Sequence, residues 1–113
     1  MNDKILETIC KLLGISPEYT AFNVDILVNI NSALSVLAQL DVNSLNGFIC
    51  TENSVWSDFV SDNTNLGMVE QYVYLKVKKI FDPPQSSFVM DSIDRQISEL
   101  EWRINAAAES NII

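Results

Sequence analysis

The sequence contains no histidine, and its only cysteines are Cys10 and Cys50. A structural zinc site needs about four cysteine or histidine ligands, so a zinc-dependent fold is excluded. The lack of histidine also excludes nucleophilic catalysis by a Ser–His or Cys–His pair. We expect the two cysteines to be free thiols in a reducing cytoplasm, with a single disulfide as the open alternative.

Glycine and proline are scarce, with three residues of each, while 48% of the residues are apolar. This composition disfavours disorder along the whole length, collagen-like structure and a β-sandwich. The isolated glycines form no phosphate-binding loop, and no apolar run approaches the roughly eighteen residues of a membrane span. The N-terminal stretch "MNDKILETICKLLG" has mixed charges, which is not the pattern of a cleavable signal. We therefore expect one soluble domain over residues 1–113, with no catalytic site, metal or cofactor.

Basic residues are also few: the chain has seven lysines and arginines and fifteen aspartates and glutamates, which gives a net charge of −8. Sequence-independent DNA binding depends on clustered basic residues, so this balance disfavours it. A wall that repels DNA while DNA slides past it remains compatible with the charge. Lys76, Lys78 and Lys79 are neighbours in sequence, but on a helix Lys78 points away from the other two. They are therefore not expected to form a phosphate-binding patch.

Apolar periodicity predicts a small all-α bundle of about five helices. The first helix is expected to run from an Asp3 cap to Leu13, with Gly14 as its end. The second opens at Asn23 or Asp25 and continues to Leu40, and its buried side is expected to hold Ile26, Ile30, Ala33, Leu34, Leu37 and Leu40.

A loop is predicted from Asp41 to Val55, with a short extended piece at "GFICT". Ser54 is the expected cap of a short third helix, "VWSDFVS".

The fourth helix is predicted from Leu66 to Phe81 and is apolar almost all round. One stripe consists of Leu66, Val69, Val73, Val77 and Ile80, and a second consists of Met68, Tyr72 and Leu75. Because a helix of this kind is buried on every side, we expect a neighbouring chain to cover part of the second stripe.

A rigid corner, Asp82–Pro83–Pro84, ends this helix, since proline cannot continue it. Ser86 or Ser87 is the expected cap of a fifth helix over about 88–108, whose apolar seam is Val89, Ile93, Ile97, Leu100 and Ile104. Phe88, Arg95 and Trp102 lie on the opposite face. Tryptophan and arginine are enriched at buried interface centres, so this face is a candidate interface. The alternative is that Trp102 packs under the 62–65 loop of its own chain.

The last residues, Ile112 and Ile113, are apolar, whereas most termini are polar and fray. They suggest that residues 108–113 form an extended docking tail. A disordered end is the alternative.

The run "LGMVEQYVYLKVKKIFDPPQSSFVMDSIDRQISELEWRIN", residues 66–105, resembles the head–tail connector proteins of tailed bacteriophages. The upstream "DILVNINSALSVLAQLDV" and "VWSDF" fit the same family, so the resemblance covers about residues 25–105. Its most specific part is the order of the helix, the "FDPP" corner and the "ELEWR" ending. Asp41 departs from the pattern, because a glycine is expected to end the second helix there.

The resemblance implies a virion protein of the neck, assembled in the host cytoplasm, that is neither an enzyme nor a cofactor binder. It implies a closed ring, usually of twelve copies, that docks on the portal protein after genome packaging. Such a ring extends the DNA channel and carries the next connector, a stopper or the tail. A different class of function, a small acidic regulator that binds a protein by mimicking DNA, shares the negative charge but has no need of the corner. A helix-turn-helix DNA binder is weaker still, because no helix offers a basic reading face.

Overall fold

A computed structural model describes residues 2–40, 47–60 and 65–110, with side chains up to residue 107. Within these ranges the chain forms α1 (Ile5–Leu13), α2 (Asn23–Gln39), α3 (Trp56–Phe59), α4 (Leu66–Phe81) and α5 (Ser87–Ser110). The only β-type pairing in the described part is an isolated antiparallel bridge between Lys4 and Val55. The all-α prediction is confirmed, including both bounds of α4.

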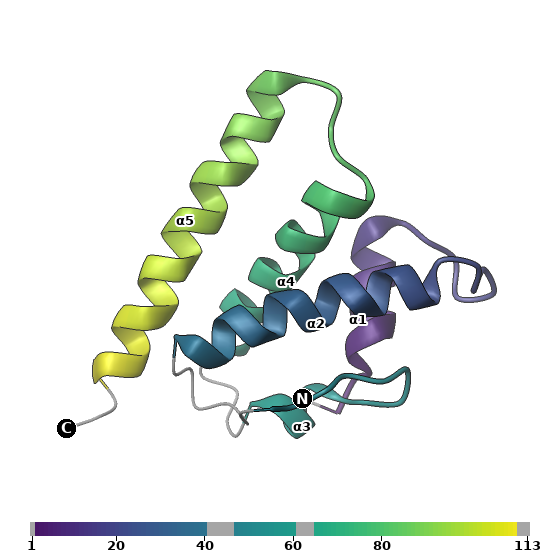
Figure 1. The fold of residues 1–113 in the computed structure, drawn as a ribbon, viewed down its shortest axis with the longest axis horizontal. Helices are drawn as coiled ribbons and strands as arrows, with labels where there is room; N and C mark the ends of the chain where they lie inside the picture. Colours follow the sequence, from purple (N-terminus) through teal and green to yellow (C-terminus); the bar gives the residue numbers. More distant parts are fainter. Residues whose placement is uncertain (1, 41–46, 61–64, 111–113) are drawn as a thin grey trace.

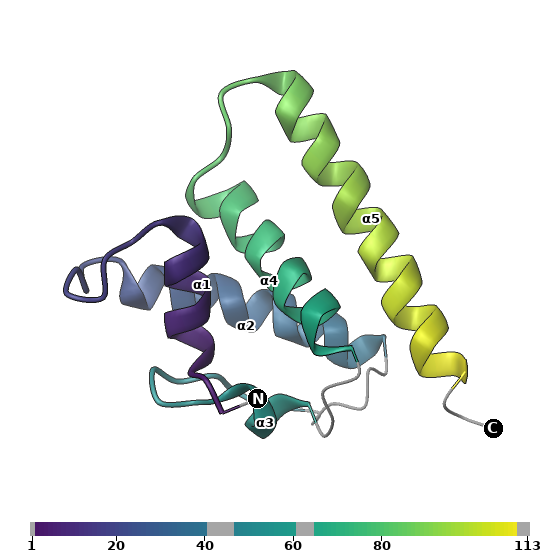
Figure 2. The ribbon, with the colours of Figure 1, turned by 180° about the vertical axis from the view of Figure 1, so that it is seen from behind.

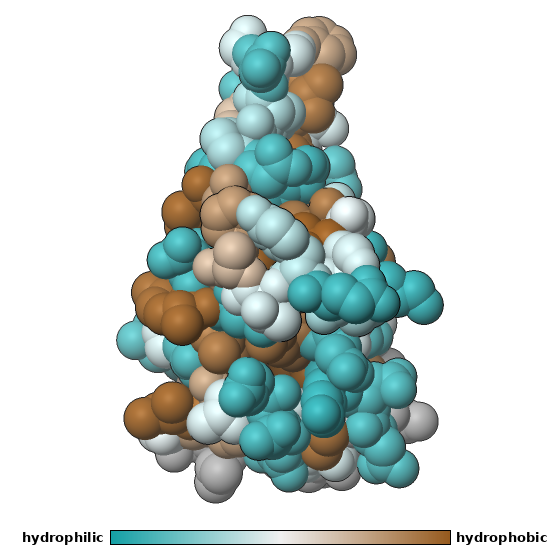
Figure 3. All heavy atoms as spheres, turned by 90° about the vertical axis from the view of Figure 1, so that its right-hand side faces the viewer, coloured by the Kyte–Doolittle hydropathy of each residue, from teal (hydrophilic) through white to brown (hydrophobic). Residues whose placement is uncertain are grey.

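Helix α4 forms the centre of the molecule and lies between α1 and α5 (Figures 1 and 2). Helix α2 crosses α4, and α5 packs along α4 in the opposite direction after the corner. The extents of 44 × 35 × 20 Å describe a flat body. Figure 3 shows that it narrows toward the corner between α4 and α5.

The predicted core side of α2 is confirmed, because Ile26, Ile30, Ala33, Leu34 and Leu37 are all buried, while Leu40 is half-buried. The central stripe of α4, Val69, Val73 and Val77, is buried as well. The stripe prediction is wrong for Ile80, which is 61% exposed. The last turn of α4 lies beyond the point where α2 crosses the helix (Figure 1).

Two of the predicted helix caps are confirmed and two are wrong. Gly14 ends α1 with a φ of 80°, which glycine adopts readily. The Ser86 hydroxyl accepts a 3.4 Å hydrogen bond from the Val89 N–H at the start of α5. Asp3 and Ser54, in contrast, cap nothing, because their positions next to the Lys4–Val55 bridge commit them to other bonds.

The bridge explains both wrong caps. The Asp3 carbonyl accepts from the Trp56 N–H at 3.1 Å, and the Ser54 carbonyl accepts from the Ile5 N–H at 3.0 Å. The Ser54 hydroxyl accepts from the Thr51 N–H at 2.9 Å. At α3 it is the Asp58 carboxylate that satisfies a terminal donor, the Val55 N–H, at 2.9 Å. The start of α1 and the start of α3 are therefore fixed by one another.

The segment before α3 is held to α2 by the side chain of Asn31. The Asn31 amide oxygen accepts from the Cys50 N–H at 2.7 Å, and its nitrogen donates to the Cys50 carbonyl at 3.1 Å. The Asn31 amide thus bonds both the N–H and the carbonyl of Cys50, which is the pair of bonds that a residue of a neighbouring antiparallel strand would form. The extended piece predicted at "GFICT" is not a strand, and residues 41–46 of the predicted loop lie outside the described residues.

Candidate assembly surfaces

The inner face of α5 is an apolar seam against α4. Ile93, Ile97, Leu100 and Ile104 are buried there, as predicted. Val89, the first predicted member, is 45% exposed, because the first turn of α5 reaches beyond the end of α4 (Figure 1). Burial of such a side chain contributes on the order of 1.5–3 kcal/mol. The seam therefore fixes which face of α5 points outward.

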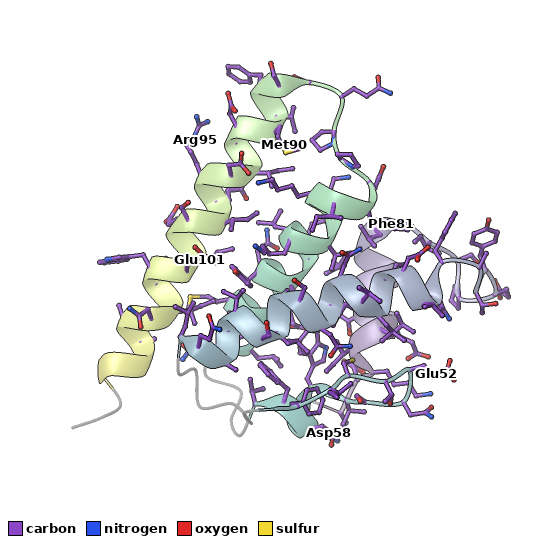
Figure 4. All side chains as sticks on the ribbon, in the orientation of Figure 1. Glu52, Asp58, Phe81, Met90, Arg95 and Glu101 are labelled. Atoms are coloured by element: carbon purple, nitrogen blue, oxygen red, sulfur yellow. The ribbon has the colours of Figure 1, made fainter. Side chains whose placement is uncertain are left out.

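Two polar contacts reinforce the seam. The Tyr72 hydroxyl donates to a Glu101 carboxylate oxygen at 2.7 Å, and Figure 4 shows Glu101 pointing toward α4. Near the corner, the Lys79 Nζ lies 2.6 Å from Asp94 Oδ1, an oxygen that is almost completely shielded from solvent. Burial, followed by the nearby Glu101 carboxylate, raises the pKa of Tyr72 well above its ordinary value. Together the two contacts hold α5 at a defined angle and register on α4.

The outer face of α5 carries the three residues predicted to form an interface. Phe88 is 80% exposed and Trp102 is 72% exposed. Arg95 is exposed between them and points away from α4 (Figure 4). Trp102 is therefore not a core residue of its own chain, and the alternative in which it packs under its own loop is wrong. Residues 62–64 of that loop lie outside the described residues.

The second stripe of α4 does not behave as expected. Tyr72 and Leu75 are buried within the subunit, and Met68 is half-buried. No neighbouring chain is needed to cover Tyr72 or Leu75. The prediction that these two residues contact another subunit is wrong, because the helical wheel shows that a face is apolar but does not show which element covers it.

The corner between α4 and α5 is tied back to α4 at its first residue. Asp82 ends the helix with φ −140° and ψ 64°, outside the helical region, and Pro83 and Pro84 follow. The Asp82 carboxylate pairs with Lys78 at 3.3 Å. A contact between the Phe22 and Phe81 rings, with centroids 5.1 Å apart, links the end of α4 to the start of α2.

The three lysines of α4 have partners within the chain. Lys78 pairs with Asp82, Lys79 pairs with Asp94, and the Lys76 ammonium lies 6.0 Å from the centroid of the Tyr72 ring. This agrees with the expectation that they do not form a phosphate-binding patch. Ile112 and Ile113, the predicted docking residues at the end of the chain, lie outside the described residues.

A groove of about 820 Å³ lies on the side of the subunit away from α5. Its walls come from α1, the connection between α1 and α2, and the turn before α3. Four charged residues line it: Lys4, which precedes α1, Glu7 and Lys11 of α1, and Glu52 of the turn. Its apolar lining consists of Leu6, Cys10, Ile15, Pro17 and Tyr19. This groove was not predicted from the sequence, because its walls come from segments that lie far apart in the chain.

Neither cysteine forms a disulfide. Cys10 and Cys50 are free and buried, as expected, and burial raises the pKa of both thiols, that of Cys50 to about 11. In the part of the chain that the structure describes, no group of three or more potential ligand side chains could hold a metal ion. None of the described helices is both long and apolar enough to cross a membrane.

Comparison with known families identifies the kind of protein to which this fold belongs. A family model described as phage connector protein matches residues 5–111. The chain belongs to this family. No curated protein and no solved structure matches the chain at a significant level. The family assignment covers nearly all of the connector, including α1, which lies before the region of resemblance at residues 25–105.

Membership gives the connector a structural role between the head and the tail of a phage. It implies a place in the neck of the virion and contacts with portal or tail proteins. A structural role of this kind is consistent with the exposed apolar and charged side chains on the outer face of α5.

Proposed function

We propose that this connector is an adaptor that assembles into a closed ring beneath the portal, with twelve copies as the resemblance implies. The ring extends the DNA channel after genome packaging and provides the platform for the next connector, a stopper or the tail. The observation that carries the proposal is the outer face of α5, where Phe88, Arg95 and Trp102 are exposed on a helix whose other face is buried from Ile93 onward.

The construction of the α4–α5 pair supports this role. The prolines, the apolar seam and the Tyr72–Glu101 and Lys79–Asp94 contacts hold α5 rigidly, so its outer face is already arranged for binding. A preorganised face loses little conformational freedom on association. Large exposed aromatics next to an arginine are the side chains that most often dominate binding energy at protein interfaces.

The net charge of −8 supports a channel through which DNA passes without being held. Negative side chains repel phosphate, and a wall that bound DNA would slow its movement. In this proposal DNA is a passenger without sequence-specific contacts. The tail around Ile112 and Ile113 is proposed to dock on the portal.

Co-sedimentation with portal rings from the same source, followed by electron microscopy, tests the proposal. We expect an added ring of density beneath the portal with a fixed number of copies. Solution mass of the free protein is not a substitute, because a ring of this kind can require the portal as its template. Absence of binding to intact portals would overturn the adaptor role and favour the acidic protein-binding regulator.

A further inference from the structure

We propose that the groove beside α1 receives the outer face of α5 from the next subunit of the ring. This inference rests on the proposed ring and names the two surfaces that join its copies. A closed ring of identical subunits needs two different, complementary surfaces on each copy, placed so that one copy follows the next. The groove and the outer face of α5 satisfy this requirement.

The two surfaces lie on opposite sides of the subunit. Helix α4 separates α1 from α5 in both ribbon views (Figures 1 and 2). Glu52 of the groove and Arg95 of α5 point out of opposite sides of the molecule (Figure 4). Figure 3, which faces the side away from α5, shows apolar residues interleaved with hydrophilic ones. A mixed surface of this kind suits a partner that is itself both aromatic and charged.

The charges on the two surfaces alternate with opposite signs. Along α1 and the residue just before it, the groove presents Lys4, Glu7 and Lys11, a positive–negative–positive series. Along α5 the exposed face presents a negative–positive–negative series, Asp91, Arg95 and Glu99. At a rise of 1.5 Å per residue, Glu7 and Lys11 lie about 6 Å apart along α1, and Arg95 lies about 6 Å from both Asp91 and Glu99 along α5. The two series therefore match in sign, and they match in spacing over the helical part of the first series.

The two aromatic residues of α5 lie on the same face as its three charges. Phe88 precedes Asp91 by three residues and Trp102 follows Glu99 by three, so at 100° per residue all five side chains fall within about 80° of arc. Helices α1 and α5 run in opposite directions along the subunit (Figure 1). A neighbour related by rotation about an axis along these helices therefore presents α5 antiparallel to α1.

This orientation fixes the pairs. Arg95 of one copy faces Glu7 of the next, with Asp91 opposite Lys11 at one end and Glu99 opposite Lys4 at the other. Phe88 then reaches the apolar wall of the groove formed by Ile15, Pro17 and Tyr19. The central pair, Arg95 with Glu7, is the same for either direction of α5, so it is the pair to test.

Cross-linking on the portal tests the contact directly. Paired carboxylate and guanidinium groups leave their Cβ atoms too far apart for a disulfide, so a short bismaleimide is the appropriate reagent. We expect the Glu7→Cys/Arg95→Cys variant to give a ladder of covalent multimers on portal rings. The matched control is Glu7→Cys/Gln96→Cys, because Gln96 is exposed one residue away but turned by about 100°. Wild type, whose own cysteines are buried, shows any background reaction.

Charge reversal provides a second readout. We expect Glu7→Arg and Arg95→Glu each to reduce the amount of protein bound to portals by roughly tenfold, and the double variant to restore it. Electron microscopy of the portal complexes distinguishes a failure of the proposed pairing from a failure of the adaptor function. A ring on the portal without a Glu7–Arg95 ladder and without rescue would overturn the pairing and leave the adaptor function intact. Absence of any ring for the wild type would overturn the adaptor function itself. Circular dichroism of each variant confirms that these exposed substitutions leave the fold unchanged.

Discussion

The hydroxyl of Tyr72 and the carboxylate of Glu101 form a 2.7 Å hydrogen bond that joins α4 to α5. The Tyr72 ring is completely buried, so the hydroxyl exchanges no bonds with bulk water. Burial and the adjacent negative charge both oppose ionisation and raise the pKa of Tyr72. The neutral phenol is therefore the form that the folded protein stabilises.

Stability should consequently fall at alkaline pH. A tyrosine in the unfolded chain ionises near pH 10, whereas folded Tyr72 ionises at higher pH. The stabilisation is fully present below about pH 10 and is lost as the pH rises above it. Urea unfolding at pH 8 should show Tyr72→Phe to be less stable than wild type by about 1 kcal/mol. This difference should shrink and then reverse above pH 10, and a difference independent of pH would contradict the assignment.

Trp102→Ala should weaken assembly on portals without affecting the fold of the monomer. The Trp102 side chain is mostly exposed, so its loss should change the free energy of unfolding by no more than about 0.5 kcal/mol. Ile97→Ala on the buried face of the same helix is the contrasting variant, and it should cost about 2–4 kcal/mol. Urea unfolding followed by portal co-sedimentation compares the two. If Trp102→Ala unfolds the chain, the outer face is part of the core and the interface is elsewhere.

Asn31→Ala should destabilise the subunit by about 1–3 kcal/mol, because it leaves the N–H and carbonyl of Cys50 without their partner. Asn29→Ala is the matched control on the same helix. The Asn29 side chain donates only to the Asp25 carbonyl, one turn earlier, and its loss should cost less than about 0.5 kcal/mol. Equal urea midpoints for the two variants would refute a special role for Asn31.

Replacement of Pro83 and Pro84 by alanine should reduce portal binding more than it reduces stability. Each proline restricts the unfolded chain, so each replacement should cost about 0.4–1 kcal/mol. The change also removes the restriction on the backbone at the corner. The angle between α4 and α5 is then fixed only by the side-chain contacts between the two helices. Equal portal binding by the corner variant and wild type would show that the prolines are not needed for docking.

Local periodicity was enough to predict most of the helical framework. The bounds of α4, the buried side of α2 and the seam of α5 from Ile93 onward follow from apolar spacing, which depends on each helix alone. Gly14 and Ser86 were predictable as caps because their partners lie within one turn. Phe88, Arg95 and Trp102 were predictable as an outer face because the opposite face is so strongly apolar.

Most of the failures involve partners far away in the sequence. Asp3 and Ser54 are residue types that often cap helices. Their carbonyl groups instead accept hydrogen bonds beside the Lys4–Val55 bridge, which joins segments about fifty residues apart. The burial of Tyr72 and Leu75 depends on how the chain turns after Pro84, which a helical wheel cannot include. The role of Asn31 depends on Cys50, nineteen residues later. Sequence periodicity describes one helix at a time, and these features belong to pairs of segments.

The two buried thiols bear on how the protein survives after it leaves the cell. A virion outside a cell meets an oxidising environment, where exposed thiolates are converted to disulfides or sulfenic acids. In this subunit burial withholds both Cys10 and Cys50 from solvent and keeps them protonated, with the pKa of Cys50 near 11. The thiol, unlike the thiolate, is a poor nucleophile. The neck protein can therefore remain chemically unaltered during long storage outside a host, without any cross-link that would need to be reduced at the next infection.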